Sequence, residues 1–179
     1  MWQLDPVLIT VAALALSAVF LTAAAHKLRA PRLFESQLAD YRLLPVRLER
    51  PVARLLPGLE LSAALALLYA PLRPAAALAL LALLALYSGA IAINLGRGRS
   101  AIDCGCLGAA LRQELSPWLL VRNGLLGLLA GACLAAPQAR PLGLHDGFTV
   151  LAATLCLLLL YVAVNYLIAF YPRIHESRG

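Results

Sequence analysis

The sequence predicts an all-α membrane protein, a DoxX-like bundle of about five transmembrane helices. Of its 179 residues, 62% are hydrophobic and 13% are charged, and the mean hydropathy is +0.82. These values lie outside the range of ordinary soluble domains. Leu and Ala also form runs as long as the roughly 20 residues that cross a bilayer. We therefore expect residues 1–179 to form a single membrane domain surrounded mainly by the lipid bilayer.

The expected spans are separated by short polar or proline-containing segments. A proline begins three of the runs, where its missing N–H costs no helical hydrogen bond. Residues 71–74 suffice only for a tight reversal, so the second and third helices should form a hairpin. No basic region precedes the first run, which favours a retained helix over a cleaved signal. The expected spans are 6–25, 55–70, 74–95, 118–136 and 148–171.

Two longer connections separate these helices. Phe34, Leu38, Tyr41 and Leu44 recur at roughly helical spacing within 26–54, which predicts a short amphipathic helix on the membrane surface. The second connection, 96–116, contains two cysteines. Alternating crossings place both connections and the C-terminus on one side, here called face A. The N-terminus, the 71–74 reversal and the 137–147 loop then lie on the opposite side, face B.

The net charge of +6 does not indicate nucleic-acid binding, because the basic residues lie between apolar runs and no nucleic-acid motif accompanies them. Their distribution instead predicts topology. Face B carries only Arg73 and Arg140, so the positive-inside rule predicts a cytoplasmic face A. The face A residues are Lys27, Arg29, Arg32, Arg42, Arg47, Arg50, Arg54, Arg97, Arg99, Arg112, Arg122, Arg173 and Arg178.

Polar residues within the apolar runs collect near face A. Each is costly in lipid, so each is expected to face the bundle interior. Together they predict a polar cavity beneath the 96–116 loop, with Glu60 paired to Lys27 or Arg122. The alternative is that Lys27 and Arg122 extend along the helix surface to reach the interface. The residues concerned are His26, Lys27, Glu60, Asn94, Arg122, Asn123 and Asn165.

The most distinctive chemical feature is the pair Cys104 and Cys106, separated by Gly105. A disulfide between them would close a small strained ring, and strained disulfides are easily reduced. Arg97 and Arg99 would favour a thiolate, whereas Asp103 would oppose it. The residues therefore indicate a redox-active pair.

Two other interpretations of the pair stay open. It could provide half of a metal site, with His26 or His175 from the same face as further ligands. It could also serve only to fold the loop. The other cysteines, Cys133 and Cys156, lie in apolar runs and are expected to pack as small hydrophobic residues.

Several motifs between about residues 14 and 130 together resemble the methylamine-utilisation membrane protein family MauE, within the DoxX-like group. The most specific is Ile102-Asp103-Cys104-Gly105-Cys106-Leu107-Gly108, although Leu107 stands where an aromatic residue is expected. The others are His26-Lys27-Leu28 with Pro31 and Phe34, Tyr41-Arg42-Leu43-Leu44-Pro45, Glu60, Asn94-Leu95 with Gly96-Arg97-Gly98, and Arg122-Asn123.

The resemblance implies a thiol–disulfide protein of the bacterial inner membrane, with Cys104 and Cys106 as the exchanging pair. It also implies a thioredoxin-like partner and a disulfide-containing substrate protein, as in maturation of the methylamine dehydrogenase small subunit in the periplasm. Asp103 and the face A polar residues would support the pair. A quinone is suggested by analogy alone, so the cofactor stays unidentified. The alternative is a non-catalytic scaffold, transporter or metal-binding protein. A periplasmic role also conflicts with the charge count, which leaves the side of face A open.

Overall fold

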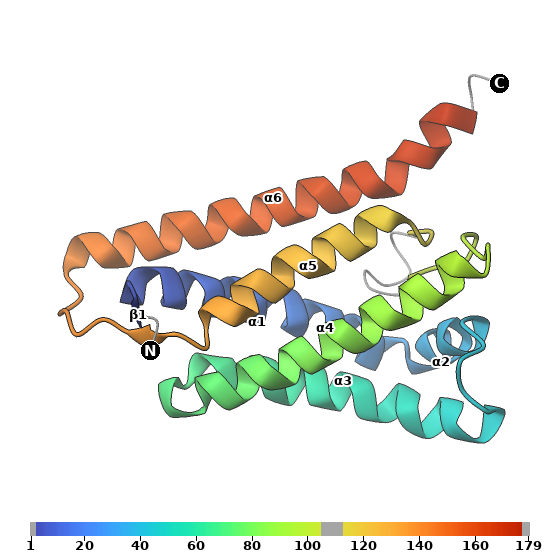
Figure 1. Ribbon diagram of the computed structural model, residues 1–179, viewed down its shortest axis with the longest axis horizontal. Coiled ribbons are helices and arrows are strands. Elements are labelled where there is room, and N and C mark those ends of the chain that lie inside the picture. The colour runs from blue at the N-terminus through green and yellow to red at the C-terminus, as the bar shows by residue number, and fades with distance from the viewer. Residues whose placement is uncertain (1–2, 105–112, 177–179) are drawn as a thin grey trace.

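The computed structural model describes residues 3–104 and 113–176, and side chains up to residue 169. The chain forms a bundle of long antiparallel helices, with the N-terminus at one end and α2 at the other (Figure 1). The predicted all-α membrane fold is confirmed. The elements are β1 (Gln3–Leu4), α1 (Pro6–Arg29), α2 (Pro31–Asp40), α3 (Val46–Leu68), η1 (Ala70–Leu72), α4 (Arg73–Gly96), α5 (Pro117–Ala132), β2 (Ala136–Pro137) and α6 (Leu144–Glu176).

Among the described residues, four helices are long and apolar enough to cross a membrane: Pro6–Arg29, Val46–Leu68, Ala70–Gly96 and Leu144–Ala169. The remaining predicted span corresponds to α5, which has 16 residues. At 1.5 Å per residue, α5 is about 24 Å long, somewhat shorter than the hydrocarbon core of about 30 Å. It nevertheless lies within the bundle, packed against α4 and α1.

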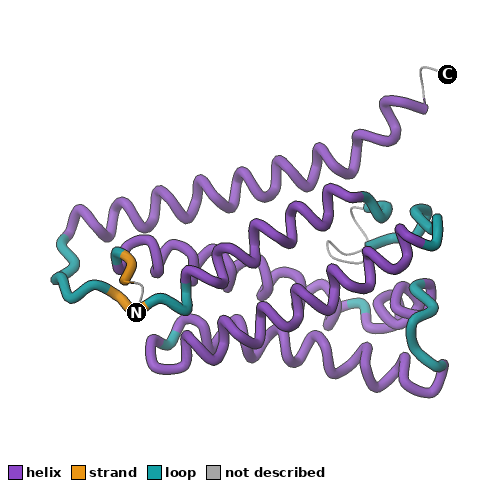
Figure 2. The backbone as a smooth tube through the Cα atoms, in the orientation of Figure 1, coloured by secondary structure: helices purple, strands orange, loops and turns teal. Residues whose placement is uncertain are grey.

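Helix α1 is the central element of the bundle. It packs against α3, α6 and α5, and small residues such as Ala12, Ala13 and Ala24 let the neighbouring backbones approach closely. The hydroxyl of Ser17 donates to the carbonyl oxygen of Ala64 in α3, at 2.8 Å. In contrast, much of α6 lies along the outside of the bundle (Figure 2), and its leucines are largely exposed.

Helix α3 begins at Val46, nine residues before the predicted membrane span 55–70. A helix can begin before its apolar run does, and the bounds of the span itself stay a prediction. Residues 46–54 remain helical while carrying Arg47, Arg50 and Arg54, and α2 packs against this helix. Pro51 and Pro57 lie within α3, so proline in this segment does not end the helix.

The predicted amphipathic segment contains a helix, α2, which covers Phe34 and Leu38 but ends before Tyr41 and Leu44. Arg42 follows with a φ of 49°, in the left-handed region that breaks helical geometry. Phe34 is buried against the bundle. Its location on a membrane surface stays a prediction.

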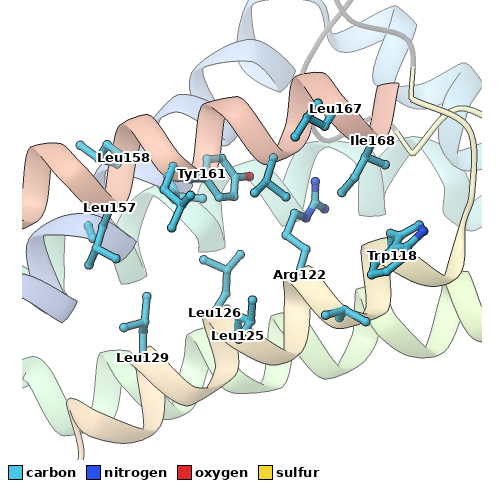
Figure 3. Close-up of a pocket in the computed structure, with 15 residues that line it drawn as sticks. Trp118, Arg122, Leu125, Leu126, Leu129, Leu157, Leu158, Tyr161, Leu167 and Ile168 are labelled. Carbon is cyan, nitrogen blue, oxygen red and sulfur yellow. The ribbon is translucent and has the colours of Figure 1, made fainter. Parts of the chain in front are cut away.

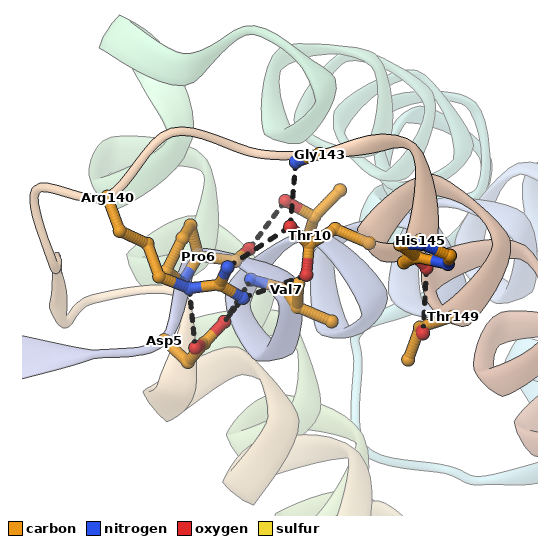
Figure 4. Close-up of polar contacts among 9 residues, drawn as sticks. Asp5, Pro6, Val7, Thr10, Arg140, Gly143, His145 and Thr149 are labelled. Atoms are coloured by element: carbon orange, nitrogen blue, oxygen red, sulfur yellow. Dashed lines mark hydrogen bonds and ion pairs between the residues drawn. The ribbon is translucent and has the colours of Figure 1, made fainter.

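At face B, polar contacts join the start of α1 to the start of α6 (Figure 4). Strands β1 and β2 pair in parallel, with Gln3 opposite Ala136. The guanidinium of Arg140 lies 2.9 Å from an Asp5 carboxylate oxygen and 2.9 Å from one of Asp146. The hydrogen bond from Arg140 lowers the pKa of Asp5 from its ordinary value of 3.8, and the two carboxylates raise the pKa of Arg140. We call these three residues the face B clamp.

Candidate functional site

The segment around Cys104 forms one side of a short hairpin. The Cys104 amide donates to the Gln113 carbonyl at 2.8 Å, and the Leu115 amide donates to the Ile102 carbonyl at 3.1 Å. Asp103 and Glu114 are bridged in antiparallel fashion. This pairing fixes the backbone at both ends of the 105–112 segment. Cys106 belongs to that segment and lies outside the described residues.

Side chains from α2 and α4 hold this hairpin over the bundle. The Gln37 amide donates to one carboxylate oxygen of Asp103 at 3.0 Å, and the other accepts from the Gln113 backbone amide at 3.2 Å. Arg99 donates to the Asn94 side-chain oxygen at 3.2 Å and to the Asp40 carbonyl at 2.9 Å. Asp103 and Asn94 therefore organise the loop and its attachment, which the sequence placed only in a general polar set.

Cys104 itself is buried, with 9% of its surface exposed. It belongs to an apolar cluster with Tyr41, Ile91, Ile102, Leu115 and Leu119. The Tyr41 hydroxyl lies 3.5 Å from the Cys104 carbonyl oxygen as a long hydrogen bond. Cys104 is therefore largely covered by its neighbours.

A buried ion pair joins α1 to α3 below the hairpin. The Lys27 ammonium contacts a carboxylate oxygen of Glu60, and the Tyr87 hydroxyl donates to the same oxygen at 2.6 Å. The ammonium also lies 5.0 Å from the centre of the Phe34 ring. Lys27 is 6% exposed and Glu60 is 1% exposed. Of the two partners considered for Glu60, the structure selects Lys27, which is buried and does not extend to the interface.

A second polar cluster surrounds Arg122. Its guanidinium donates to Asn165 of α6 at 2.7 Å, to Gln113 of the hairpin at 3.3 Å and to Asn123 at 3.3 Å. The Asn123 amide donates in turn to the Ser88 hydroxyl of α4 at 3.2 Å. Arg122 is 6% exposed, so it too is held inside the protein. Through Gln113, this cluster connects directly to the backbone of Cys104.

Two expectations about the polar residues need correction. His26 is exposed, so it does not join the interior polar residues. Consecutive helical residues are rotated by about 100°, and burial of Lys27 turns His26 outward. The buried polar groups also bond to one another instead of lining an open polar cavity. Tyr87, Gln113 and Gln37 escaped the sequence analysis because a single neutral polar residue gives little signal in a hydropathy pattern. Tyr87 and Ser88 interrupt an apolar run, which was the available sign.

The cavity found at this level of the bundle is mainly apolar. It measures about 510 Å³ and lies between α5 and α6, with Ala15 and Val19 of α1 at its base. Arg122, Tyr161 and Trp118 are its polar or amphipathic lining residues (Figure 3). Within residues 3–104 and 113–176 there is no group of three or more His, Cys, Asp or Glu side chains placed to hold a metal ion.

The fold and this site define a class: a polytopic helical-bundle membrane protein whose buried polar clusters underlie a cysteine-bearing hairpin. Comparison with known proteins identifies the family. The family model described as "Methylamine utilisation protein MauE" matches residues 5–136. The chain belongs to this family, which confirms the resemblance seen in the sequence motifs.

Individual relatives are similar over most of the chain. The methylamine utilization protein MauE of Methylophilus methylotrophus is 38% identical over 181 residues, covering 96% of this chain and 92% of the relative. That of Paracoccus denitrificans is 37% identical, covering 92% and 89%. That of Methylorubrum extorquens is 43% identical, covering 89% and 87%. No solved structure matches the chain.

Proposed function

We propose that this chain is a thiol–disulfide exchange protein that assists maturation of a disulfide-containing partner protein in methylamine utilisation. The observation that carries the proposal is the attachment of Cys104. Its backbone is paired with Gln113 at 2.8 Å, and the adjacent Asp103 is bonded to Gln37 of α2 at 3.0 Å. A cysteine whose backbone is fixed in this way suits repeated exchange with a nearby thiol. Family membership provides the methylamine context.

The proposed exchange transfers two electrons and two protons from the substrate thiols to the partner disulfide. A substrate thiolate attacks one sulfur of the Cys104–Cys106 disulfide, forms a mixed disulfide and releases the other cysteine as a thiolate. The second substrate thiol attacks the mixed disulfide, so the substrate leaves oxidised. The chain then holds two thiols, having gained two electrons and two protons. The disulfide of a thioredoxin-like partner accepts them and is reduced to two thiols.

The burial of Cys104 suggests different roles for the two cysteines. Cys104 is 9% exposed and packed in an apolar cluster, so it is a poor first point of contact for a substrate protein. We therefore assign the mixed disulfides with the substrate and with the thioredoxin-like partner to Cys106. Cys104 is the thiolate released when the substrate attacks, and it later attacks the mixed disulfide with the partner, which re-forms the Cys104–Cys106 disulfide and releases the reduced partner. Arg122, Gln113, Gln37 and Asp103 act as positioning residues, because they hold the hairpin without belonging to the exchanging pair.

Single serine variants test these roles. Cys104→Ser should accumulate a mixed disulfide between Cys106 and the thioredoxin-like partner, because Cys106 attacks the partner disulfide and the thiol that resolves the adduct is missing. Cys106→Ser should accumulate little, and the double variant should show neither trapping nor substrate maturation. Non-reducing electrophoresis and mass spectrometry would detect the adducts. Cys133→Ser, at a buried cysteine of the bundle, is the matched control. Full substrate maturation by the double variant would exclude the proposal.

The proposed disulfide formation requires face A to lie outside the cytoplasm of a bacterial inner membrane, against the arginine count. A membrane-impermeant thiol reagent, applied to intact cells after mild reduction, should therefore label Cys104 or Cys106. The Cys104→Ser, Cys106→Ser double variant sets the background. Labelling that appears only after the cells are lysed would place the pair in the cytoplasm. It would favour a reducing or non-redox role.

A further inference from the structure

A charged groove at face A takes no part in the proposed disulfide exchange. It lies between α2 and the first turns of α3, which pack side by side (Figure 1). Its volume is about 670 Å³, within the range of small-molecule sites. Five charged side chains line it: Arg32, Glu35, Glu49, Arg50 and Arg54. Both signs of charge therefore meet in one groove.

Helical spacing brings these charges to the groove. Arg32 and Glu35 are three residues apart on α2, and Arg50 and Arg54 are four apart on α3, the spacings at which side chains share one face of a helix. Two arginines at this spacing repel each other, and a bound anion would offset that cost. The arginines are exposed, whereas Glu35 and Glu49 are partly buried. The positive charges are thus the more accessible ones, and the negative charges lie deeper.

These five charges are not neutralised by one another. Within residues 3–104 and 113–169, no ion pair or side-chain hydrogen bond joins any of them to another side chain. An anion alone would be repelled by the glutamates, and a cation alone would be repelled by the arginines. A ligand that carries an anionic and a cationic group close together satisfies both sets of charges.

The groove lies at the level where lipid headgroups are expected. Helix α1 ends at Arg29, just before α2 begins, and the predicted span 55–70 starts directly after Arg54. Along that span, Leu55 and Leu59 are 61% and 45% exposed, which gives acyl chains an apolar surface next to the groove. Phosphatidylethanolamine combines acyl chains with an anionic phosphate and a cationic ammonium, and so matches both the charges and their level.

We propose that the groove between α2 and α3 binds the headgroup of phosphatidylethanolamine, with its phosphate at Arg50 and Arg54 and its ammonium at Glu35 and Glu49. Arginine donates several hydrogen bonds to a phosphate, and a primary ammonium donates to carboxylate oxygens. The quaternary ammonium of phosphatidylcholine has no N–H to donate, and phosphatidylglycerol has no cation. The glutamates therefore select the lipid, while the arginines hold a phosphate that all three lipids share. This site is independent of the proposed disulfide exchange.

Native mass spectrometry of the detergent-solubilised full chain tests the site. The three lipids, with identical acyl chains, would be titrated in parallel. Phosphatidylethanolamine should bind about fivefold more tightly than phosphatidylcholine, the size expected for exposed charge pairs. Equal affinity for these two lipids, or tighter binding of phosphatidylglycerol, would overturn the proposal. Water-soluble O-phosphoethanolamine should bind much more weakly than the lipid, because it lacks acyl chains. Equally tight binding of this soluble compound would overturn the assignment to a lipid.

Variants of the glutamates test the selection step. The double variant Glu35→Gln, Glu49→Gln should lose the preference for phosphatidylethanolamine over phosphatidylcholine, because no carboxylate remains to accept from the ammonium. Asp40→Asn is the matched control, since Asp40 is an exposed acid of α2 that does not line the groove. A preference that survives in the double variant, or that is lost in the control, would contradict the assigned ammonium site.

Variants of the arginines test the phosphate site separately. Arg50→Gln combined with Arg54→Gln should weaken phosphatidylethanolamine and phosphatidylcholine by a similar factor, about fivefold or more, because both lipids carry the phosphate. Arg47→Gln, at an exposed arginine of α3 outside the groove, should bind both lipids as the wild-type chain does. Unchanged affinities in the double variant would overturn the proposal. Melting temperatures verify that each variant is folded.

Discussion

The two ends of the bundle both join distant segments through charged side chains, but they do so in opposite environments. At face B, Arg140 and Asp5 are 38% and 35% exposed. Below the hairpin at face A, the side chains of Lys27 and Glu60 are 5% and 1% exposed. An exposed pair gains little because water screens it, whereas removing one partner of a buried pair leaves an uncompensated charge. The face B clamp therefore restrains a loop, while the Lys27–Glu60 pair maintains the packing of α1 on α3.

The largest effect is expected from Glu60→Gln. This change leaves the Lys27 ammonium buried without its carboxylate, a loss of about 3–5 kcal/mol for buried pairs. The free energy of unfolding, measured in detergent by denaturant titration, should fall by that order. Lys27→Met combined with Glu60→Met should recover much of the loss, because no buried charge remains. If the single variant is as stable as the wild-type chain, the pair does not contribute as inferred here.

An intermediate effect is expected where the hairpin meets α2. Gln37→Ala removes the 3.0 Å hydrogen bond to Asp103, worth about 1 to 3 kcal/mol for a bond to a charged group. Opening of the hairpin should become easier, and alkylation of Cys104 should accelerate about fivefold or more. A background with Cys106→Ser, Cys133→Ser and Cys156→Ser isolates the Cys104 signal, and exposed Ser36→Ala on the same helix is the control. Equal alkylation rates in both variants would show that Gln37 does not hold the loop.

The smallest effect is expected from Asp5→Asn in the face B clamp. The folded-state pKa of Asp5 lies below its ordinary value of 3.8, through the Arg140 hydrogen bond. The contribution of Asp5 is therefore present above the unfolded-state pKa and is lost as pH falls through the folded-state pKa. Proteolysis of the 133–143 loop should increase as pH falls below about 3.8, the ordinary pKa of the Asp5 carboxyl. Asp5→Asn should show a flatter profile. Identical profiles would exclude the clamp as the restraint.

The comparison also shows how far sequence reasoning reaches. The cost of charged side chains in lipid predicted burial of Lys27, Glu60 and Arg122. It did not predict which residues they bond to. Hydropathy assigns a depth to each residue, whereas pairing depends on the rotation of each helix about its axis. Glu60 accordingly had two acceptable partners until packing of α1 on α3 selected Lys27. His26 was predicted to be interior because hydropathy does not give the rotation of α1. In the structure its neighbour Lys27 occupies the interior face of that helix.

The sequence by itself determined the membrane environment, the order of the long helices, the family and the cysteine-bearing loop between α4 and α5. These properties follow from composition, run length and short motifs, which are local in the chain. Only the tertiary structure decided that the polar residues form two bonded clusters, that Gln113 connects Arg122 to the Cys104 backbone, and that α5 and α6 enclose an apolar groove. Each of these depends on side chains far apart in the sequence, whose meeting is set by helix packing.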